Sequence, residues 1–221
     1  MTKQDILKQY FGYDDFRNGQ EELINGILQG KDVLGIMPTG AGKSICFQIP
    51  AAMFLGLTIV ISPLISLMKD QVNALTQSGI SAALINSTLS EQEMFFTLQE
   101  ARNNAYKLIY VAPERLLNSN FLNFAQSVNI SMVTVDEAHC ISQWGHDFRP
   151  SYSQITMFIE QLYERPVISA FTATATPQVR EDIVSLLGLK NPVRVVTGFD
   201  RPNLFLVYKN TVIKNINLMR Y

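Results

Sequence analysis

The chain has 221 residues, of which 47% are hydrophobic and 17% are charged, as expected for one soluble domain with a single core. Eighteen Lys and Arg against nineteen Asp and Glu give a formal net charge of −1, which excludes a global positive field that would attract nucleic acid or an anionic membrane. The two cysteines, Cys46 and Cys140, lack further Cys or His at metal-ligand spacing, so we expect no disulfide framework, no zinc site and a reducing, intracellular setting.

Segments rich in β-branched residues alternate with segments of helical periodicity along the whole chain. The strand segments are continuously hydrophobic, so both of their faces must be covered, which predicts an α/β fold with a central, mostly parallel sheet and helices on both faces. The expected strands are residues 33–37, 58–62, 82–86, 107–112, 132–136, 167–173 and 193–197, with one more strand or extended connector at 205–208. The expected helices are residues 19–29, 43–54, 64–77, 91–103, 115–125, 151–163 and 177–187.

Capping residues support two of these helix boundaries. Ser90 precedes Glu93 by three residues, a capping box in which the hydroxyl and the carboxylate each satisfy a free backbone amide. Thr176 can cap the helix whose first turn holds Pro177, and Gly188 can end that helix in a left-handed conformation.

An uncharged stretch at residues 44–68 is long enough to suggest a membrane span. It is interrupted by Pro50, Gly56 and Pro63, and this pattern favours a helix, a turn and a buried strand. The first residues also lack the apolar segment of a secretory signal. No membrane association is therefore expected.

A glycine-rich segment follows the strand at 33–37 directly and leads into a helix, although Met37 stands where the usual phosphate-loop pattern has its first glycine. Small residues let a phosphate approach the backbone, and the start of the helix presents its positive end to the anion. We expect Lys43 to bridge the β and γ phosphates of a nucleoside triphosphate and Ser44 to bind Mg²⁺. The alternative is a glycine-rich turn with an exposed lysine. The expected nucleotide-binding residues of this segment are Thr39, Gly40, Ala41, Gly42, Lys43 and Ser44.

Two carboxylates end the strand at 132–136, where ligands bind in open α/β sheets. Asp136 is placed to hold Mg²⁺ through water, and Glu137 is the candidate to orient or deprotonate the attacking water. Taken alone, an acidic pair before a helix is more often a feature of the helix start. Together with the phosphate loop, it makes Glu137, Asp136 and Lys43 the expected catalytic residues.

Residues 11–20 resemble the adenine-reading motif of RecQ helicases, which are superfamily 2, DEAH-type DNA helicases. The resemblance implies that the Gln20 amide pairs with N6 and N7 of adenine, the geometry known from base readout. Tyr13 could stack on the base, with Arg17 beside it. The alternative is an N-terminal helix that packs through its aromatic residues.

Two further segments, residues 62–71 and 112–116, resemble the motifs of the same family that contact the DNA backbone. Both lie at strand-to-helix turns, where hydroxyls and helix-start amides can hold a phosphodiester without reading sequence. The alternative for each is a helix start initiated by proline. The residues carried over from the family are Ser62, Pro63, Pro113 and Glu114.

Residues 140–152 resemble the aromatic-rich loop that is characteristic of RecQ enzymes. Its aromatic side chains offer flat faces for stacking on unpaired bases, worth roughly 1–3 kcal/mol per base. The alternative is that Trp144 anchors a surface loop onto the core. The expected stacking residues are Trp144, His146 and Phe148, and the expected relays to the acidic motif are His139, Gln143 and Arg149.

Residues 169–176 resemble the family motif that hydrogen-bonds the acidic segment, with Thr172 and Thr174 as its hydroxyl residues, although threonines at strand ends are also common helix caps. Residues 198–204 resemble the exit from the family's first motor domain, so the motifs together span residues 11–204.

The resemblance implies a RecA-like ATP-binding domain over residues 1–208 and, over residues 209–221, the start of a connection to a second such domain. It further implies ATP and Mg²⁺ as ligands, single-stranded or partially duplex DNA as partner, 3′-to-5′ helicase activity, a monomer and a cytoplasmic location, with the nucleoid if the source is bacterial. The second domain would supply arginines to the ATP site, so these 221 residues alone are expected to hydrolyse ATP weakly and not to unwind DNA. The alternatives are a nucleotide-binding or DNA-binding module without turnover and an RNA helicase, which the aromatic-rich loop and a histidine at position 139 disfavour.

Overall fold

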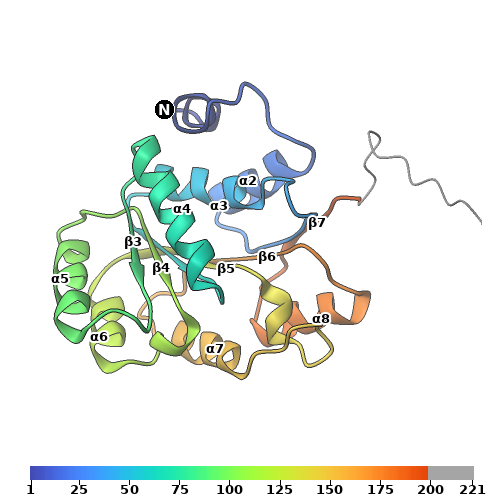
Figure 1. Ribbon diagram of the computed structural model, residues 1–221. Coiled ribbons are helices and arrows are strands. Elements are labelled where there is room, and N and C mark those ends of the chain that lie inside the picture. The colour runs from blue at the N-terminus through green and yellow to red at the C-terminus, as the bar shows by residue number, and fades with distance from the viewer. Residues whose placement is uncertain (199–221) are drawn as a thin grey trace, which may run out of the picture.

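In residues 1–198, the part of the chain that the computed structural model describes, seven strands form one sheet in the order β3-β4-β2-β5-β6-β1-β7 (Figure 1). Every neighbouring pair is parallel, so the carboxyl ends of all strands lie along the same edge. The strands are β1 (Val33–Ile36), β2 (Leu57–Ile61), β3 (Ala82–Ile85), β4 (Leu108–Val111), β5 (Ile130–Val135), β6 (Val167–Thr172) and β7 (Val193–Val196). The predicted α/β fold with a parallel sheet is confirmed.

Helices cover both faces of the sheet, and Figure 1 shows the two layers. On β4, Tyr110 packs into the core between the sheet and the first layer, while Ile109 and Val111 pack into the core on the opposite face. Because both faces are covered, the strands are hydrophobic over most of their length. The first layer is α2 (Gln20–Leu28), α3 (Lys43–Met53) and α4 (Ile65–Ser78); the second is α5 (Glu91–Arg102), α6 (Ser119–Ser127), α7 (Ser153–Glu160) and α8 (Pro177–Leu186).

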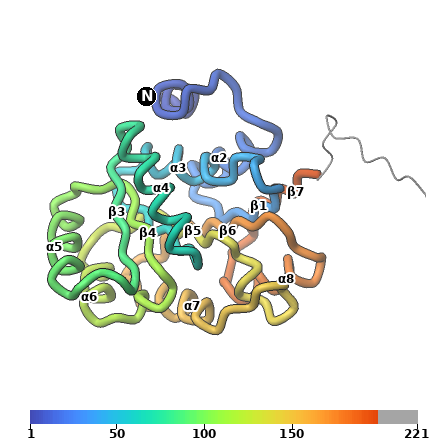
Figure 2. Tube along the Cα trace, in the orientation of Figure 1, coloured from blue at the N-terminus to red at the C-terminus, as the bar shows by residue number. Residues whose placement is uncertain are grey.

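A short helical segment precedes the first layer and lies on the outer side of α2 and α3 (Figure 2). It consists of α1 (Lys3–Ile6), which Thr2 caps, and a turn of π-helix, η1 (Leu7–Phe11). Ile6 and Leu7 form a small core with Ile24 of α2 and Ile49 of α3. The predicted elements did not include this segment, because its few apolar residues give no extended periodicity.

The predicted capping residues act as expected. Ser90 and Glu93 form the capping box of α5, and the Thr176 hydroxyl accepts from the amide of Val179 at the start of α8. Gly188, at φ 60°, follows the end of α8.

Two predicted helices differ from the structure by more than one residue at their bounds. Pro113–Arg115 forms a separate 3₁₀ turn, and α6 begins only at Ser119, because the Asn118 side chain accepts from the amides of Asn120 and Phe121. Pro150–Tyr152 is likewise a 3₁₀ turn before α7, so the helix predicted over 151–163 is shorter at both ends. The predicted strand at 205–208, the domain boundary at 208 and most of the 198–204 motif lie outside the described residues.

The stretch at 44–68 forms α3, β2 and the start of α4, in agreement with the expected helix, turn and strand. Across residues 1–198, no helix combines the length and the apolar composition required to cross a membrane.

A buried carboxylate ties the amino ends of three strands together, at the edge opposite the predicted site. Asp32, which is 3% exposed, accepts from Arg165 Nη1 and Nη2 at 3.1 and 2.6 Å. It also accepts from the backbone amides of Ile168 at 2.9 Å and Lys190 at 2.7 Å. One side chain thus joins β1 to β6 and to the turn that precedes β7.

Candidate functional site

The glycine-rich loop between β1 and α3 requires glycine at two positions. Gly40 and Gly42 both have left-handed backbone conformations, at φ 83° and 81°. A Cβ at position 42 would also overlap Nε2 of Gln20, whereas a Cβ at position 40 would meet open space. The loop therefore combines backbone freedom with close packing against α2, as a cradle for a phosphate requires.

Lys43 is the first residue of α3, and its ammonium donates to the carbonyl of Met37 at 3.1 Å. Ser44 follows in the first turn of the helix. Because β5, β6 and β1 are adjacent and parallel, the end of β5 with its two carboxylates lies one strand away from this loop. The Lys43 ammonium lies near enough to lower the pKa of both Asp136 and Glu137. The loop and the acidic pair therefore meet at one edge of the sheet.

Two side chains of the N-terminal motif, residues 11–20, donate hydrogen bonds to backbone carbonyls of the phosphate loop. The Gln20 side chain is buried, and its Nε2 donates to the carbonyls of Ala41 and Gly42, each at 3.1 Å. Its Oε1 accepts from the amide of Arg17 at 2.8 Å, and the Arg17 guanidinium donates to the Gly40 carbonyl at 2.5 Å. Both ends of the Gln20 amide are thus engaged by backbone groups, so pairing with adenine would require it to exchange partners.

Tyr13 remains available beside this motif. Its side chain is 48% exposed, and the Arg17 guanidinium lies 5.8 Å from the centre of its ring. This places a flat aromatic face beside the phosphate loop, where adenine is expected from the resemblance to RecQ helicases.

Asp136 lies at the end of β5 and is almost fully buried. Its Oδ2 accepts from the Ser62 hydroxyl at 3.4 Å and its Oδ1 from the amide of Glu137 at 3.0 Å. Burial raises the pKa of Asp136 to about 6, and the neighbouring carboxylate of Glu137 adds to the rise. A buried anion of this kind is a natural partner for a cation.

Glu137 differs in both backbone and charge. Its backbone is left-handed at φ 47°, which is rare for a residue with a side chain. The hydrogen bond from His139, whose Nδ1 lies 3.3 Å from Oε2, holds the pKa of Glu137 below its ordinary value despite partial burial. Glu137 is therefore ionised under conditions in which Asp136 still binds a proton.

His139 connects the acidic segment to the end of β6. The Thr172 hydroxyl donates to the carbonyl of Thr174 at 3.1 Å, and its oxygen shares with Glu137 Oε2 the one hydrogen that His139 Nδ1 can carry, at 2.7 and 3.3 Å from Nδ1. The amide of Thr174 donates back to the same hydroxyl at 3.3 Å. The hydrogen bond between the threonine motif and the acidic segment, which the resemblance implies, is present.

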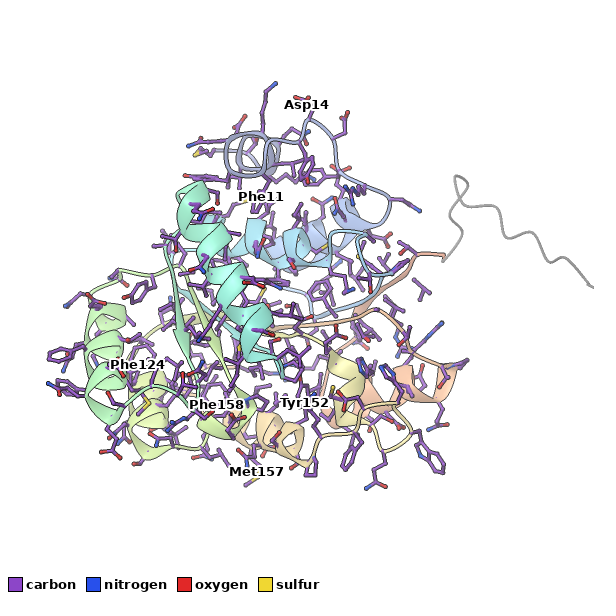
Figure 3. The ribbon with its side chains drawn as sticks, in the orientation of Figure 1. Phe11, Asp14, Phe124, Tyr152, Met157 and Phe158 are labelled. Atoms are coloured by element: carbon purple, nitrogen blue, oxygen red, sulfur yellow. The ribbon has the colours of Figure 1, made fainter. Side chains whose placement is uncertain are left out.

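The aromatic-rich loop is anchored to the acidic segment at Tyr152, and its own two ends are joined to each other. The hydroxyl of Tyr152, a fully buried residue labelled in Figure 3, donates to the Asp136 carbonyl at 2.8 Å. The amide of Arg149 donates to the Cys140 carbonyl at 2.9 Å. The Arg149 side chain pairs with Asp147 at 3.0 Å and donates to the carbonyl of Pro63 at 3.1 Å, so it also joins the loop to the turn after β2.

The tip of this loop faces solvent. Trp144 is 77% exposed and Phe148 is 44% exposed, so the alternative in which the tryptophan anchors the loop onto the core is wrong. His146 is exposed but stacks on His139, with ring centres 4.1 Å apart, so one of its faces is covered. Gln143 is exposed and makes no hydrogen bond that reaches the acidic motif among the described residues.

The four residues expected to contact the DNA backbone differ in their exposure to solvent. Ser62 is only 2% exposed and its hydroxyl bonds Asp136, so it does not present this group to the surface as predicted. Pro113 is buried and Pro63 is half-buried, while Glu114 is exposed. The sequence predicts Ser62 at a turn. This turn follows β2, which lies beside β5, and the Ser62 side chain is therefore buried.

Three residues of the site were not assigned a role from the sequence. Tyr152 holds the Asp136 carbonyl, Ser142 is fully buried inside the loop, and Asp182 reaches that loop from α8. No spacing in the sequence marks these contacts, since each joins elements that meet only in the folded chain.

Gly145 allows the loop to pass close to the acidic segment. A Cβ at this position would overlap the carbonyl oxygen of His139 and lie 3.1 Å from that of Ser142. Both atoms belong to the backbone and cannot rotate away. Gly145→Ala is therefore expected to displace the loop and to lower the free energy of unfolding by about 1–3 kcal/mol, as overpacking does.

The effect of Gly145→Ala is measured by denaturant unfolding and by the fluorescence of Trp144, the one tryptophan of the sequence. Gly30→Ala is the control, because Gly30 is also left-handed, at φ 75°, but has open space around its Cβ position. The control should leave the Trp144 emission unchanged. Equal emission spectra for wild type and Gly145→Ala would contradict the claim that Gly145 allows the loop to pass close to the acidic segment.

The site fits a magnesium nucleotide. Gly40 has open space where a Cβ would lie, and Lys43 begins α3 directly after the loop. Residues 1–198 contain no group of three or more His, Cys, Asp or Glu arranged to hold a metal ion, but Mg²⁺ is usually held by one or two protein oxygens together with phosphates and water. Asp136, with a pKa raised by burial, and Ser44 supply such oxygens.

A sequence profile of the DEAD/DEAH box helicase family matches residues 17–183. The chain is 54% identical over 202 residues to the ATP-dependent DNA helicase RecQ of Bacillus subtilis (strain 168), over 91% of this chain and 34% of that protein. It is 48% identical over 203 residues to the ATP-dependent DNA helicase RecQ of Pasteurella multocida (strain Pm70), over 92% and 32%. The Pyrococcus furiosus Hef helicase domain, 18% identical, matches the fold with a TM-score of 0.61 over 81% of this chain and 38% of that one.

The chain belongs to the DEAD/DEAH box helicase family, since the profile covers most of its length. Within this family its similarity is to the RecQ helicases, and the resemblance predicted from the motifs is thereby confirmed. The chain spans about a third of the length of these relatives.

Proposed function

We propose that this chain is the ATP-binding motor domain of a 3′-to-5′ DNA helicase of the RecQ type. The observation that carries the proposal is the meeting of the phosphate loop with the acidic pair at the carboxyl edge of the sheet. Lys43, which begins α3 after the loop that follows β1, lies near enough to the carboxylates at the end of β5 to lower their pKa values. The names of the relatives support ATP and DNA as the substrates.

In the proposed mechanism, the residues of the loop hold the triphosphate and the acidic pair acts on the water. Backbone amides of residues 40–44 and the Lys43 ammonium bind the β and γ phosphates. Asp136 and Ser44 would hold Mg²⁺, which would neutralise charge on these phosphates. Glu137, kept ionised by His139, orients the attacking water and accepts its proton.

We further propose that the aromatic-rich loop binds single-stranded DNA and couples it to this site. Trp144 and Phe148 are exposed and can stack on unpaired bases without reading sequence. Two contacts join the loop to the ATP site. The Tyr152 hydroxyl donates to the Asp136 carbonyl, and the His146 ring stacks on the His139 ring. A shift of the loop on DNA binding would therefore move the backbone of the catalytic pair.

A second RecA-like domain is proposed as the partner that completes the ATP site. An arginine supplied across such a site contributes on the order of 10³–10⁵ in rate. The 221 residues tested alone should therefore bind ATP and Mg²⁺ but hydrolyse ATP slowly and leave duplex DNA intact. A turnover comparable with that of a complete helicase would overturn this part of the proposal. The monomeric state and the cytoplasmic location remain predictions.

Nucleotide binding with and without Lys43→Ala tests the proposal. Removal of a charge-assisted contact worth about 1.5–3 kcal/mol should weaken ATP binding about tenfold or more. Titration calorimetry measures this, and Lys69→Ala, which removes an exposed lysine of α4, is the matched control. Equal affinity of Lys43→Ala and wild type for ATP would contradict the proposed loop.

A second measurement separates the motor from a binding module. Slow hydrolysis that rises when single-stranded DNA is added supports the motor, and binding without turnover in either condition supports a binding module. Competition between DNA and RNA oligonucleotides of the same sequence distinguishes the DNA helicase from an RNA helicase.

A further inference from the structure

One buried hydroxyl organises the base of the aromatic-rich loop. Ser142 follows the 3₁₀ turn Ala138–Ile141 and is fully buried. Its hydroxyl donates to Asp182 Oδ2 at 2.6 Å and accepts from the amide of Trp144 at 3.1 Å. A hydroxyl has one hydrogen, and an ionised carboxylate can only accept a hydrogen bond. The Ser142 hydrogen therefore points to Asp182, and a lone pair of the same oxygen is left for the amide of Trp144.

Asp182 is itself held in place on α8. Its second oxygen, Oδ1, accepts from Gln178 Nε2 one turn earlier in the same helix, at 2.9 Å. The helix follows β6, whose Thr172 bonds His139. The segment formed by β6 and α8 thus holds the acidic motif at His139 and the aromatic-rich loop at Ser142.

Asp182 also borders the space beside the exposed tryptophan. The loop, α7 and α8 enclose a groove of about 580 Å³. Trp144 and Phe148 line it from the loop, and Asp182 and Leu186 line it from α8. Trp144, Phe148 and Leu186 give the groove an apolar part, and Asp182 is the charged group of its lining.

We infer that Asp182 is a positioning residue for the DNA-binding loop, which it acts on through Ser142 to hold the backbone of Trp144 in one orientation. The inference rests on the proposed function, because it assumes that Trp144 meets DNA. Within residues 1–198, the hydrogen bonds of Asp182 go to Ser142 and Gln178 and to no nucleotide-binding or acidic residue. Its contribution is to pre-organise the loop, so that less ordering is needed when a base stacks.

The loss of pre-organisation has a measurable effect on the affinity for single-stranded DNA. When only a fraction of molecules holds the competent orientation, the apparent Kd rises by the inverse of that fraction. A loop that holds its orientation about a tenth of the time without Asp182 would bind single-stranded DNA about tenfold more weakly. ATP affinity should not change, since the contacts of the phosphate loop are untouched.

The test uses Trp144 as the reporter, because the sequence contains no other tryptophan. An unlabelled oligothymidylate is titrated into the chain, and the emission of Trp144 is followed with excitation at a wavelength where tyrosine does not absorb. Wild type should show saturable quenching. Asp182→Ala should need about tenfold more DNA for half-saturation, and Asp182→Asn, which keeps an acceptor for Ser142, should recover most of the affinity.

Two controls separate positioning from a general loss of structure. Glu181→Ala removes the neighbouring carboxylate of α8, which pairs with Arg194 and not with the loop, and should bind DNA as wild type does. Ser142→Ala should match Asp182→Ala, and the double variant should be no weaker than either, because both remove the same link. Every variant should still unfold in one cooperative thermal transition, and its ATP affinity should stay near the wild-type value.

The outcomes are distinct. Wild-type affinity in Asp182→Ala, additive effects of Ser142→Ala and Asp182→Ala, or a parallel loss of ATP affinity would each overturn the inference. The absence of any response of wild-type Trp144 to DNA would instead contradict the proposed function of the loop, and the inference with it. Normal ATP binding in that experiment would leave the nucleotide site standing.

Discussion

Asp32→Ala is expected to lower the free energy of unfolding by about 3 kcal/mol, although Asp32 lies at the edge of the sheet opposite the proposed site. The substitution leaves the buried amide of Ile168 and the amide of Lys190 without their acceptor. It also removes the partner of Arg165, whose side chain is 29% exposed and can turn partly to water. The cost therefore comes mainly from the unpaired amides.

Chemical denaturation followed by circular dichroism measures this change. Glu181→Ala is the control, because it breaks an ion pair with Arg194 in which both side chains are largely exposed. Such a pair is worth less than about 1 kcal/mol, so the two variants should differ clearly. A loss of stability in Asp32→Ala as small as in Glu181→Ala would show that the network at the amino ends of the strands is not a structural anchor.

Asp136→Asn is expected to raise stability at neutral pH while it abolishes Mg²⁺-dependent nucleotide binding. Burial raises the pKa of Asp136 from 3.8 to about 6, so the folded chain carries a charge that the unfolded chain bears at lower free energy. Two pKa units correspond to on the order of 3 kcal/mol. Asparagine offers one acceptor fewer to the Ser62 hydroxyl and the Glu137 amide, which reduces the net gain to about 1–3 kcal/mol.

The gain should depend on pH in a defined direction. Between pH 3.8 and about 6 the folded state binds more protons at Asp136 than the unfolded state, so this carboxyl lowers stability as the pH rises. Below that window both states are protonated and the charge penalty vanishes, so only the lost acceptor remains and the variant should be as stable as wild type or slightly less stable. Above it the difference should be constant. Denaturation of both proteins across this range measures the effect, with Asp70→Asn, an exposed carboxylate of α4, as the control.

A variant that is less stable than wild type above pH 6 would contradict the assignment of Asp136 as a strained, buried anion. The same variant should have lost the increase in ATP affinity that Mg²⁺ produces in wild type. Opposite signs for stability and ligand binding are expected where a charge is kept for function.

The features that the sequence predicts well are those encoded by neighbours along the chain. Continuous β-branched segments predict strands covered on both faces, and the loop before Lys43 predicts a phosphate site because its glycines and its strand-to-helix context are local. The position of Asp136 at the same edge follows from parallel pairing, a rule that needs no knowledge of side chains. These are the parts of the fold and site that the sequence identifies.

The contacts that it did not identify depend on which elements meet. Ser62 was expected at the surface, but β2 lies beside β5, and its hydroxyl therefore bonds Asp136. Gln20 was assigned to adenine, yet its amide holds the backbone of the phosphate loop. The later start of α6 is different, because Asn118 is a capping residue and a closer reading of the sequence could have found it.

The most direct test of the account is a crystal structure with Mg²⁺ and a non-hydrolysable ATP analogue. It should show the β and γ phosphates against residues 40–44, Mg²⁺ between these phosphates and Asp136, and the adenine beside Tyr13 and Gln20. A triphosphate bound elsewhere, or a metal ion far from Asp136, would contradict the claim that the phosphate loop and the acidic pair form a single site.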